Sequence, residues 1–352
     1  EGVYMLLVSL AAGCLLATSA LQRSPPARRR CSRSRLPTLQ VNSDSRATQE
    51  YFDFLLGKTE IEPTEDQPSV IVGGGKIGEM LREFGERRGF EDVVLGRGEA
   101  IPSGHPGPVY LAVPAAELDA AIELCPEEKR DDLVFLSDGQ LEPLFQRHGL
   151  YGPCQASLWL ALMRRGGKPV DGRVTDLSGT TDGLSRVHGK WSGAFAMRMG
   201  TGGILCREAN QRDARRTTLE KLVFVTAYNL VGAAHGGLSM GEVAGKHGEE
   251  VGAMCRELAS FVRYTLSVSL FSGLDDRLAD YARTMEFLPT RLDAGAFPFT
   301  SGYFYRYTKM AGTRTTPAGI KVEIPDTTPL HTEYLLEARD RGLVGKELLD
   351  AA

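Results

Sequence analysis

This sequence of 352 residues has few cysteines, few tryptophans and little net charge. Its six cysteines form no C-x-x-C pair and show no metal-like spacing, which argues against a disulfide framework and a zinc site. The formal net charge is −4, from 41 Lys and Arg against 45 Asp and Glu. A nucleic-acid-binding domain is usually strongly basic, so we expect no nucleic-acid partner.

The proportions of hydrophobic and charged residues indicate a globular protein. Hydrophobic residues make up 42% of the chain and charged residues 24%, which excludes a disordered or collagen-like chain. The length allows two domains and burial of roughly 75% of the surface on folding. Forty glycines predict many tight turns and close backbone approaches.

The first 46 residues differ in composition from the rest. An apolar run over residues 3–21 precedes a Ser- and Arg-rich stretch, and residues 1–46 hold seven arginines against two acids. An apolar h-region followed by an acid-poor, Arg-rich stretch resembles the bipartite leader of proteins sent to the plastids of some algae. The alternatives are a secretory signal or a membrane anchor, for which about 20 apolar residues are needed. We expect residues 1–46 to be a leader and residues 47–66 a linker or packing arm.

A glycine-rich motif follows the first apolar strand of the fold. The run Ser69–Val72 has the composition of a buried parallel strand, and the helical pattern of residues 79–88 follows the motif. The glycines fit G-x-G-x-x-G, whose first member allows the tight turn, whose second lets the backbone approach a pyrophosphate, and whose third lets the helix pack closely. We predict that this loop binds a dinucleotide at the helix N-terminus. The predicted loop residues are Gly73, Gly74, Gly75, Lys76, Ile77 and Gly78.

The residues after the second strand indicate which nucleotide binds. That strand, residues 92–95, leads into Gly96 and Arg97, with Glu99 two positions further on. An acid here hydrogen-bonds the ribose of NAD, whereas an arginine accommodates the 2′-phosphate of NADP. Because Arg97 is nearest the strand end, we predict NADP, and Glu99 leaves NAD open.

Further strands predict an α/β fold, a Rossmann-like doubly wound parallel sheet with a second, mostly α-helical domain. Apolar runs at residues 108–114 and 132–137 fit two more strands, and the second ends in Asp138, where ligands of such sheets bind. Residues 155–205 predict short strands and turns. We place the dinucleotide-binding domain at residues 67–210 and the helical domain at residues 211–352, with the active site in the cleft between them.

Three segments resemble the ketopantoate reductase family, within the wider 6-phosphogluconate-dehydrogenase-like group. The first segment is the glycine motif with the strand that ends at residues 95–98. The second is the strand that ends Leu136-Ser137-Asp138-Gly139, where the family has Gln-Asn-Gly. The third is a helix that begins at Glu220. The resemblance spans about residues 68–340. It implies an NADP-dependent reductase of a small oxo acid or ketone.

The resemblance also implies site residues in the C-terminal half. Lys221 matches the family's catalytic lysine and Asn229 its second asparagine, while Ser301 is a match for its substrate-binding serine. Lys221 opens a long apolar run typical of a buried helix. Its ammonium at a cleft edge would protonate a carbonyl oxygen. Asn229 lies about 80° round the helix, so both side chains can line one cavity.

The chain also departs from the family's pattern. Val225 stands where the first asparagine belongs, Asp138 adds a negative charge, and Thr313 replaces a glutamate. These departures leave a second class of function open, a non-catalytic nucleotide-binding or assembly protein of the plastid, associated with a membrane complex.

Three other patterns are weaker. Residues 237–241 fit G-x-S-x-G, which would make the chain a serine hydrolase only if a strand precedes and a helix follows. The histidines at 235, 247 and 331 lack the spacing of a ligand pair, so we predict no metal site. The aromatic cluster at residues 297–307 is typical of a core, and its neighbours Arg306 and Lys309 are candidates for holding a substrate anion.

Overall fold

The computed structural model describes residues 64–175, 181–315 and 320–351, so the expected leader and most of the expected linker lie outside the described residues. The central element is a seven-stranded sheet in the order β11-β10-β5-β4-β3-β1-β2. Its strands are β1 (Val70–Val72), β2 (Val93–Leu95), β3 (Val109–Leu111), β4 (Leu133–Phe135), β5 (Cys154–Ser157), β10 (Ser185–His188) and β11 (Cys206–Glu208).

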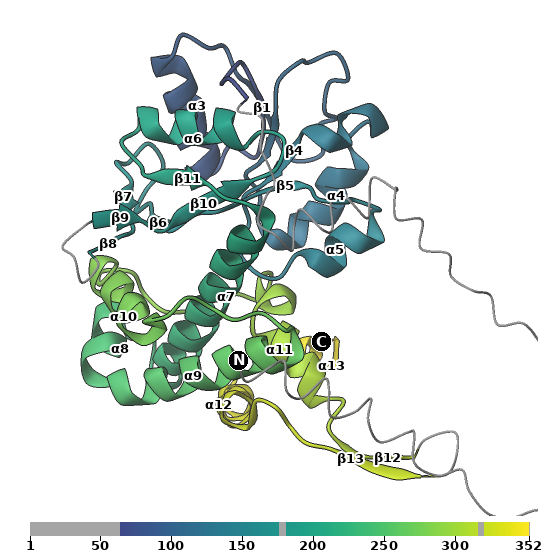
Figure 1. Cartoon of the computed structure of the whole chain (residues 1–352), viewed down its shortest axis with the longest axis vertical. Coiled ribbons are helices and arrows are strands. Elements are labelled where there is room, and N and C mark those ends of the chain that lie inside the picture. The colour runs from purple at the N-terminus through teal and green to yellow at the C-terminus, as the bar shows by residue number, and fades with distance from the viewer. Residues whose placement is uncertain (1–63, 176–180, 316–319, 352) are drawn as a thin grey trace, which may run out of the picture. The chain divides into compact units, whose positions relative to one another are not determined.

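Helices cover both faces of this sheet (Figure 1). Successive side chains of a strand point to opposite faces. Ile71, Tyr110 and Val134 accordingly pack in one cluster with α3 (Lys76–Arg87) and α6 (Ser192–Thr201). Their strand neighbours pack in a second cluster, which holds residues of α4 (Leu118–Glu123) and α5 (Glu142–Arg147). The prediction of a Rossmann-like sheet is confirmed.

The strand order places a switch point between β1 and β3. The chain steps from β1 outward to β2 and then returns to the other side of β1 for β3. Strands β1 to β5 all run parallel, so their carboxyl ends lie at one edge of the sheet. Ligands of open α/β sheets bind at such a switch point, outside the carboxyl ends. The glycine motif follows β1 and therefore lies at this position.

Residues 155–205 contain more regular structure than their sequence predicts. The expected short strands are there, including the hairpins β6 (Leu160–Ala161)–β7 (Val170–Asp171) and β8 (Arg173–Thr175)–β9 (Thr181–Gly183). Strand β10 pairs antiparallel with β5, so the sheet is mixed. The prediction of strands and turns alone was wrong for α6, whose glycines and lone buried arginine hide its amphipathic pattern.

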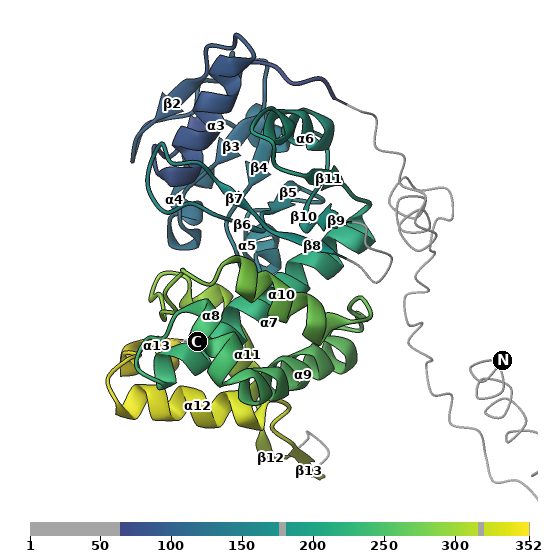
Figure 2. The ribbon, with the colours of Figure 1, turned by 90° about the vertical axis from the view of Figure 1, so that its left-hand side faces the viewer.

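The C-terminal domain is mostly helical, as predicted. A helix of 24 residues, α7, packs against α9 and α12 and also contacts β5 and β10 (Figure 2). The domain consists of α7 (Gln211–Ala234), α8 (Met240–Lys246), α9 (Gly248–Thr265), α10 (Leu274–Thr284), α11 (Ser301–Thr308), the hairpin β12 (Gly312–Thr315)–β13 (Lys321–Ile324), α12 (Pro329–Asp340) and α13 (Lys346–Ala351). Within the described ranges, none of the helices has both the length and the apolar character that crossing a membrane requires.

Helix α7 begins earlier than the sequence predicts. It starts at Gln211, nine residues before the expected Glu220. Asn210 caps it, because its side-chain oxygen accepts a hydrogen bond of 2.8 Å from the backbone N–H of Asp213. Lys221 therefore lies in the interior of the helix rather than at its edge. The first turns of α7 are rich in charged residues, so the apolar pattern of the sequence does not indicate where the helix starts.

The G-x-S-x-G pattern is part of a helix connection. Helix α7 precedes it, where a nucleophile elbow needs a strand. Ser239 caps α8 in a reciprocal capping box: its oxygen accepts from the N–H of Glu242, and the Glu242 carboxylate accepts from the N–H of Ser239. The serine hydrolase alternative is therefore wrong, since Ser239 has a structural role at a helix start.

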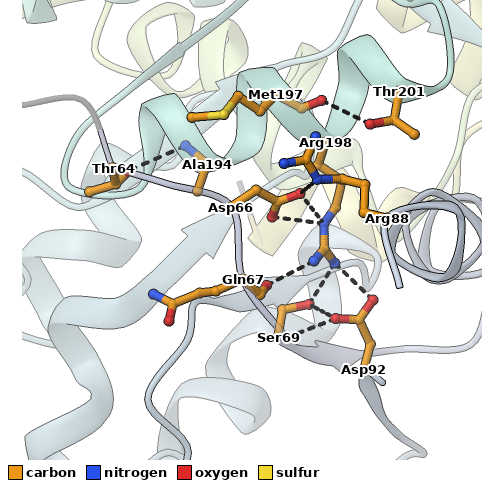
Figure 3. A network of polar contacts seen from close by, with 10 residues as sticks. All are labelled: Thr64, Asp66, Gln67, Ser69, Arg88, Asp92, Ala194, Met197, Arg198 and Thr201. Carbon is orange, nitrogen blue, oxygen red and sulfur yellow. Dashed lines mark hydrogen bonds and ion pairs between the residues drawn. The ribbon is translucent and has the colours of Figure 1, made fainter. Parts of the chain in front are cut away.

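A buried polar network joins the start of the described chain to the sheet domain (Figure 3). Arg198 of α6 is fully buried and donates to the Asp92 carboxylate at 2.9 Å and to the Asp66 carboxylate at 3.2 Å. It also donates to the hydroxyl of Ser69 at 2.8 Å and the carbonyl of Gln67 at 2.9 Å. The side chains of both aspartates are fully buried as well. Part of the expected linker is thus fixed to the fold by an ion-pair network.

Candidate nucleotide site and lysine centre

The glycine motif forms a tight turn between β1 and α3. Gly73 has φ +100°, a region that side chains rarely adopt, and a Cβ there would lie 2.7 Å from the carbonyl oxygen of Ala112. A Cβ on Gly78 would lie 1.9 Å from the carbonyl oxygen of Gly73. Both glycines are therefore required by the close approach of the helix and the strand ends.

Gly75 differs from these two glycines. Its φ of −73° suits any residue, and a Cβ there would meet no atom within 4 Å. It is the N-cap of α3, and no side chain caps this helix among the residues described. The first N–H groups of a helix and its dipole attract anions. The loop therefore has open space in front of an uncapped helix start, which matches what a pyrophosphate needs.

The first turn of α3 carries one acid, and arginines offset its charge. Hydrogen bonds from Arg82 hold the pKa of Glu79 below its usual value, and a bond from Arg165 adds to this effect. The Arg165 guanidinium lies 3.3 Å from the Glu79 carboxylate. A Cβ on Gly74 would lie 3.7 Å from the same guanidinium. Lys76 donates to the carbonyl of Leu162 at 3.1 Å. The β6–β7 hairpin thus brings Arg165 beside the glycine loop, a contact that the sequence analysis missed.

Arg97 follows β2 as expected and is held at the surface. Its side chain is 83% exposed and forms an ion pair with Glu117. Glu99 instead turns back onto the backbone, where its carboxylate accepts from the N–H of Gly96 at 2.8 Å. Both charged side chains of this turn are exposed and each already has a partner, and Arg97 is the cation of the two.

The carboxyl ends of β1, β3 and β4 are connected by direct contacts. Gly73, after β1, packs on Ala112 and Val113, which follow β3. The hydroxyl of Ser137, after β4, donates to the carbonyl of Val113 at 2.6 Å. Asp138 is the next residue. The sheet edge therefore leads from the glycine loop to Asp138 without interruption.

Asp138 binds Lys221 of the helical domain. The Lys221 ammonium lies 2.5 Å from the Asp138 carboxylate and also donates to the carbonyl of Leu158. Lys221 is 8% exposed, whereas 44% of the Asp138 side chain is exposed. The lysine is thus enclosed by protein and held toward a half-exposed carboxylate at the sheet edge. Two of the three ammonium hydrogens are engaged, which leaves one for a ligand.

Ser301 lies next to the same strand end. Gln140 donates from its backbone N–H to the carbonyl of Phe299 at 2.8 Å, and a Cβ on Gly139 would lie 2.6 Å from that oxygen. Ser301 begins α11 two residues later and is 2% exposed. The structure therefore brings Asp138, Lys221 and the segment of Ser301 to one region of the domain interface.

Asn229 makes contacts within the helical domain. Its amide nitrogen donates to the carbonyl of Val225 at 2.8 Å, and its oxygen accepts from the N–H of Arg291 at 3.0 Å. It lies eight residues after Lys221, about 12 Å along the axis of α7. These two bonds anchor a loop on the helix, and the assigned role beside Lys221 stays a prediction.

A cavity of about 590 Å³ lies between α5 and α11. Arg306 and Lys309 both line it, together with Gln140. Lys309 also donates to the carbonyl of Asp350 at 2.9 Å, and Arg306 stacks on the Tyr303 ring, 5.0 Å from its centre. Tyr303 and Phe304 are buried, so part of the aromatic cluster is core, as its composition indicated. The anion site at Arg306 and Lys309 stays a prediction.

The sheet order and the helical C-terminal domain define a Rossmann-like fold followed by a helical domain, and solved structures with this fold are known. A ketopantoate reductase of the PanE/ApbA family from Ralstonia eutropha JMP134 is 15% identical, with a TM-score of 0.51 over 78% of this chain and 99% of that chain. D-mandelate dehydrogenase, in a ternary structure with NADH and anilino(oxo)acetate, is 11% identical, with a TM-score of 0.53 over 78% and 100%. No protein-family model and no curated protein matches the sequence. The likeness concerns the fold.

Proposed function

We propose that this chain is an NADP-dependent reductase of a small oxo acid or ketone. The observation that carries this proposal is the unbroken set of contacts from the glycine loop through Val113 and Ser137 to Asp138 and Lys221. The glycine loop and an enclosed ammonium therefore share one edge of the sheet. The D-mandelate dehydrogenase structure contains NADH and anilino(oxo)acetate, which supports this class of reaction.

The residues present fit a dinucleotide. Gly75 leaves open space before the uncapped start of α3, where the pyrophosphate would lie. Arg97 would meet the 2′-phosphate, and Arg165 beside Gly74 would add a second cation near the phosphates. When bound, the reduced nicotinamide supplies hydride.

Lys221 would supply the proton. Its ammonium holds a proton at Nζ that a carbonyl oxygen needs on becoming a hydroxyl. Asp138 and the Leu158 carbonyl fix the position of Nζ, so the remaining N–H is already oriented when a carbonyl arrives. Stabilisation of a developing oxyanion by such a fixed donor is a large contribution to catalysis.

Blocking the open space at Gly75 should abolish nucleotide binding and leave the fold intact. In the full chain, NADPH at about 100 times its dissociation constant adds about 2.7 kcal/mol to the free energy of unfolding. We therefore expect the melting temperature to rise by about 5 °C or more. The Gly75→Val variant should melt close to the wild type without ligand, because a Cβ there meets no atom within 4 Å. It should show no shift with NADPH, because its side chain would fill the space proposed for the pyrophosphate.

The matched control is Gly104→Val. A Cβ on Gly104 also meets no atom within 4 Å, but this glycine lies away from the motif. The control should keep the full NADPH shift. An equal shift in Gly75→Val and wild type would refute the glycine-loop site. No shift in the wild type with NADPH or NADH would favour the non-catalytic assembly role.

Arg97 should determine the preference for NADP. A hydrogen bond to a charged group contributes about 1.5–3 kcal/mol, so we expect Arg97→Gln to weaken NADPH binding about 10- to 100-fold and to leave NADH binding unchanged. The side chain is exposed, and its surface ion pair adds little to stability. Isothermal titration with both nucleotides measures this difference. Arg87→Gln, which removes another exposed arginine paired with a glutamate, is the control. Equal weakening for both nucleotides would contradict the assignment.

The plastid destination also belongs to this proposal. It depends on residues 1–46, which lie outside the described residues. Expression of the chain with a fluorescent C-terminal fusion in an alga with secondary plastids would test it.

A further inference from the structure

Two histidines and a glutamate meet at the far end of α7. The Glu250 carboxylate lies 2.8 Å from Nε2 of His235 and 3.0 Å from Nδ1 of His247. The three ligand atoms all lie within 4.8 Å of one another. These histidines are twelve residues apart and follow no known ligand spacing, so the sequence alone predicts no metal site.

The elements that supply these side chains explain why they converge. His235 is the C-cap of α7, His247 is both the C-cap of α8 and the N-cap of α9, and Glu250 lies in the first turn of α9. Helices α7, α8 and α9 pack against one another. The three residues therefore project from helix ends of a packed core, which restricts their movement.

The cluster offers the donor set of a tetrahedral metal ion. Zinc binds imidazole nitrogens and carboxylate oxygens at about 2.0–2.2 Å, which places ligand atoms about 3.3–3.6 Å apart. The distances from the Glu250 carboxylate, 2.8 and 3.0 Å, would lengthen on binding, and the two imidazole rings, now stacked with centres 3.7 Å apart, would turn until both nitrogens face the ion. The side chains are 36%, 23% and 26% exposed for His235, His247 and Glu250, so water can reach the cluster and serve as the fourth ligand.

Electrostatics also favour a cation at this position. The C-terminus of α7 carries partial negative charge, and the Glu250 carboxylate adds a full one.

A neighbouring tyrosine positions the carboxylate. The hydroxyl of Tyr334, from α12, donates to Oε1 of Glu250. Hydrogen bonds to a metal-binding carboxylate orient it, and their loss typically weakens metal binding 10- to 100-fold. Through Tyr334 the cluster also contacts a fourth helix, α12.

We propose that His235, His247 and Glu250 bind one divalent transition-metal ion, with zinc as the best match, and that this ion ties the ends of α7 and α9 together. The set of two nitrogens and one carboxylate oxygen disfavours Mg²⁺ and Ca²⁺, which take oxygen ligands. His235 follows Lys221 by fourteen residues, about 21 Å along α7. The ion is thus separate from the nucleotide site.

The full chain, freed of metal with a chelator and dialysed, tests this proposal. ZnCl₂ in excess should raise its melting temperature by about 5 °C or more, and MgCl₂ should not. CoCl₂ should give the visible absorption of tetrahedral Co²⁺. The variant Tyr334→Phe should bind Zn²⁺ about 10- to 100-fold more weakly. The variants His247→Gln and Glu250→Gln should lose the shift and the absorption.

His148→Gln is the matched control. His148 also contacts a carboxylate, that of Asp119 at 2.7 Å, and should not affect zinc binding. Binding of zinc in His247→Gln as tight as in the wild type would place the metal elsewhere, for example on the cysteines. Absence of any zinc shift or cobalt absorption in the wild type would overturn the proposal. If His247→Gln or Glu250→Gln melts far below the metal-free wild type, Tyr334→Phe takes its place in the test. Weaker zinc binding by Tyr334→Phe than by the wild type would then support the site.

Discussion

Replacing Lys221 with methionine should slow the reduction of the substrate by about 10²- to 10⁴-fold, the usual contribution of a positioned proton donor. Methionine has a similar length and cannot donate a proton. Its thioether can fill the enclosed position, where Lys221 is 8% exposed. The Asp138 side chain is 44% exposed and can be hydrated after the change, so the fold should persist. The rate is measured as loss of NADPH absorbance with a panel of 2-oxo acids and ketones.

The decisive comparison is between chemistry and nucleotide binding. Lys221→Met should keep the NADPH-induced rise in melting temperature, because the glycine loop is untouched. Lys246→Met, which removes a surface lysine paired with Glu242, serves as the control and should keep the full rate. A rate within twofold of the wild type in Lys221→Met would exclude Lys221 as the proton donor. If no member of the panel is reduced by the wild type, the non-catalytic alternative gains support.

Replacing Arg198 with methionine should destabilise the protein by about 3–5 kcal/mol, which is the usual effect of removing one partner from a buried ion pair. The Asp66 and Asp92 side chains are fully buried, and Asp92 would lose the arginine that faces it. Arg88, at 2.9 Å from Asp66, would still neutralise that carboxylate. Urea unfolding of the full chain, followed by circular dichroism, measures the change.

The control for this effect is Arg87→Met. Arg87 pairs with Glu83 on the surface of α3, and such exposed pairs contribute about 0–1 kcal/mol. The contrast between the two variants isolates the contribution of burial. A loss below 1 kcal/mol in Arg198→Met would mean that the carboxylates are hydrated or protonated without the arginine, and that the network contributes little.

The sheet domain could be predicted where local signals agree with one another. From β1 to α3, a β-branched run, a glycine turn and an amphipathic helix all point to the same structure, and Gly73 and Gly78 have the roles expected of them. Helix α6 escaped prediction because Gly193 and Gly200 lower its apparent helix propensity. Its core-facing arginine is matched by acids more than a hundred residues away in sequence.

The candidate site could be predicted only in part. Asp138 and Lys221 were each identified from their places in the sequence, but their ion pair depends on how two domains meet. The same holds for Arg165, which a hairpin brings to the glycine loop. Contacts between distant segments leave no periodicity in the sequence. Residue spacing therefore indicates the glycine loop, but it does not indicate that Arg165 lies beside the loop or that Asp138 pairs with Lys221.

The network around Arg198 has a consequence for how far the chain can be shortened from its N-terminal side. Its N-terminal members are Asp66 and Gln67, and Thr64 adds a bond from its hydroxyl to the N–H of Ala194, at 3.2 Å. A chain shortened to begin at Thr64 keeps every one of these contacts. A chain shortened past Asp66 leaves the Arg198 guanidinium buried without that carboxylate. The first described residues therefore belong to the folded domain and contribute to its stability.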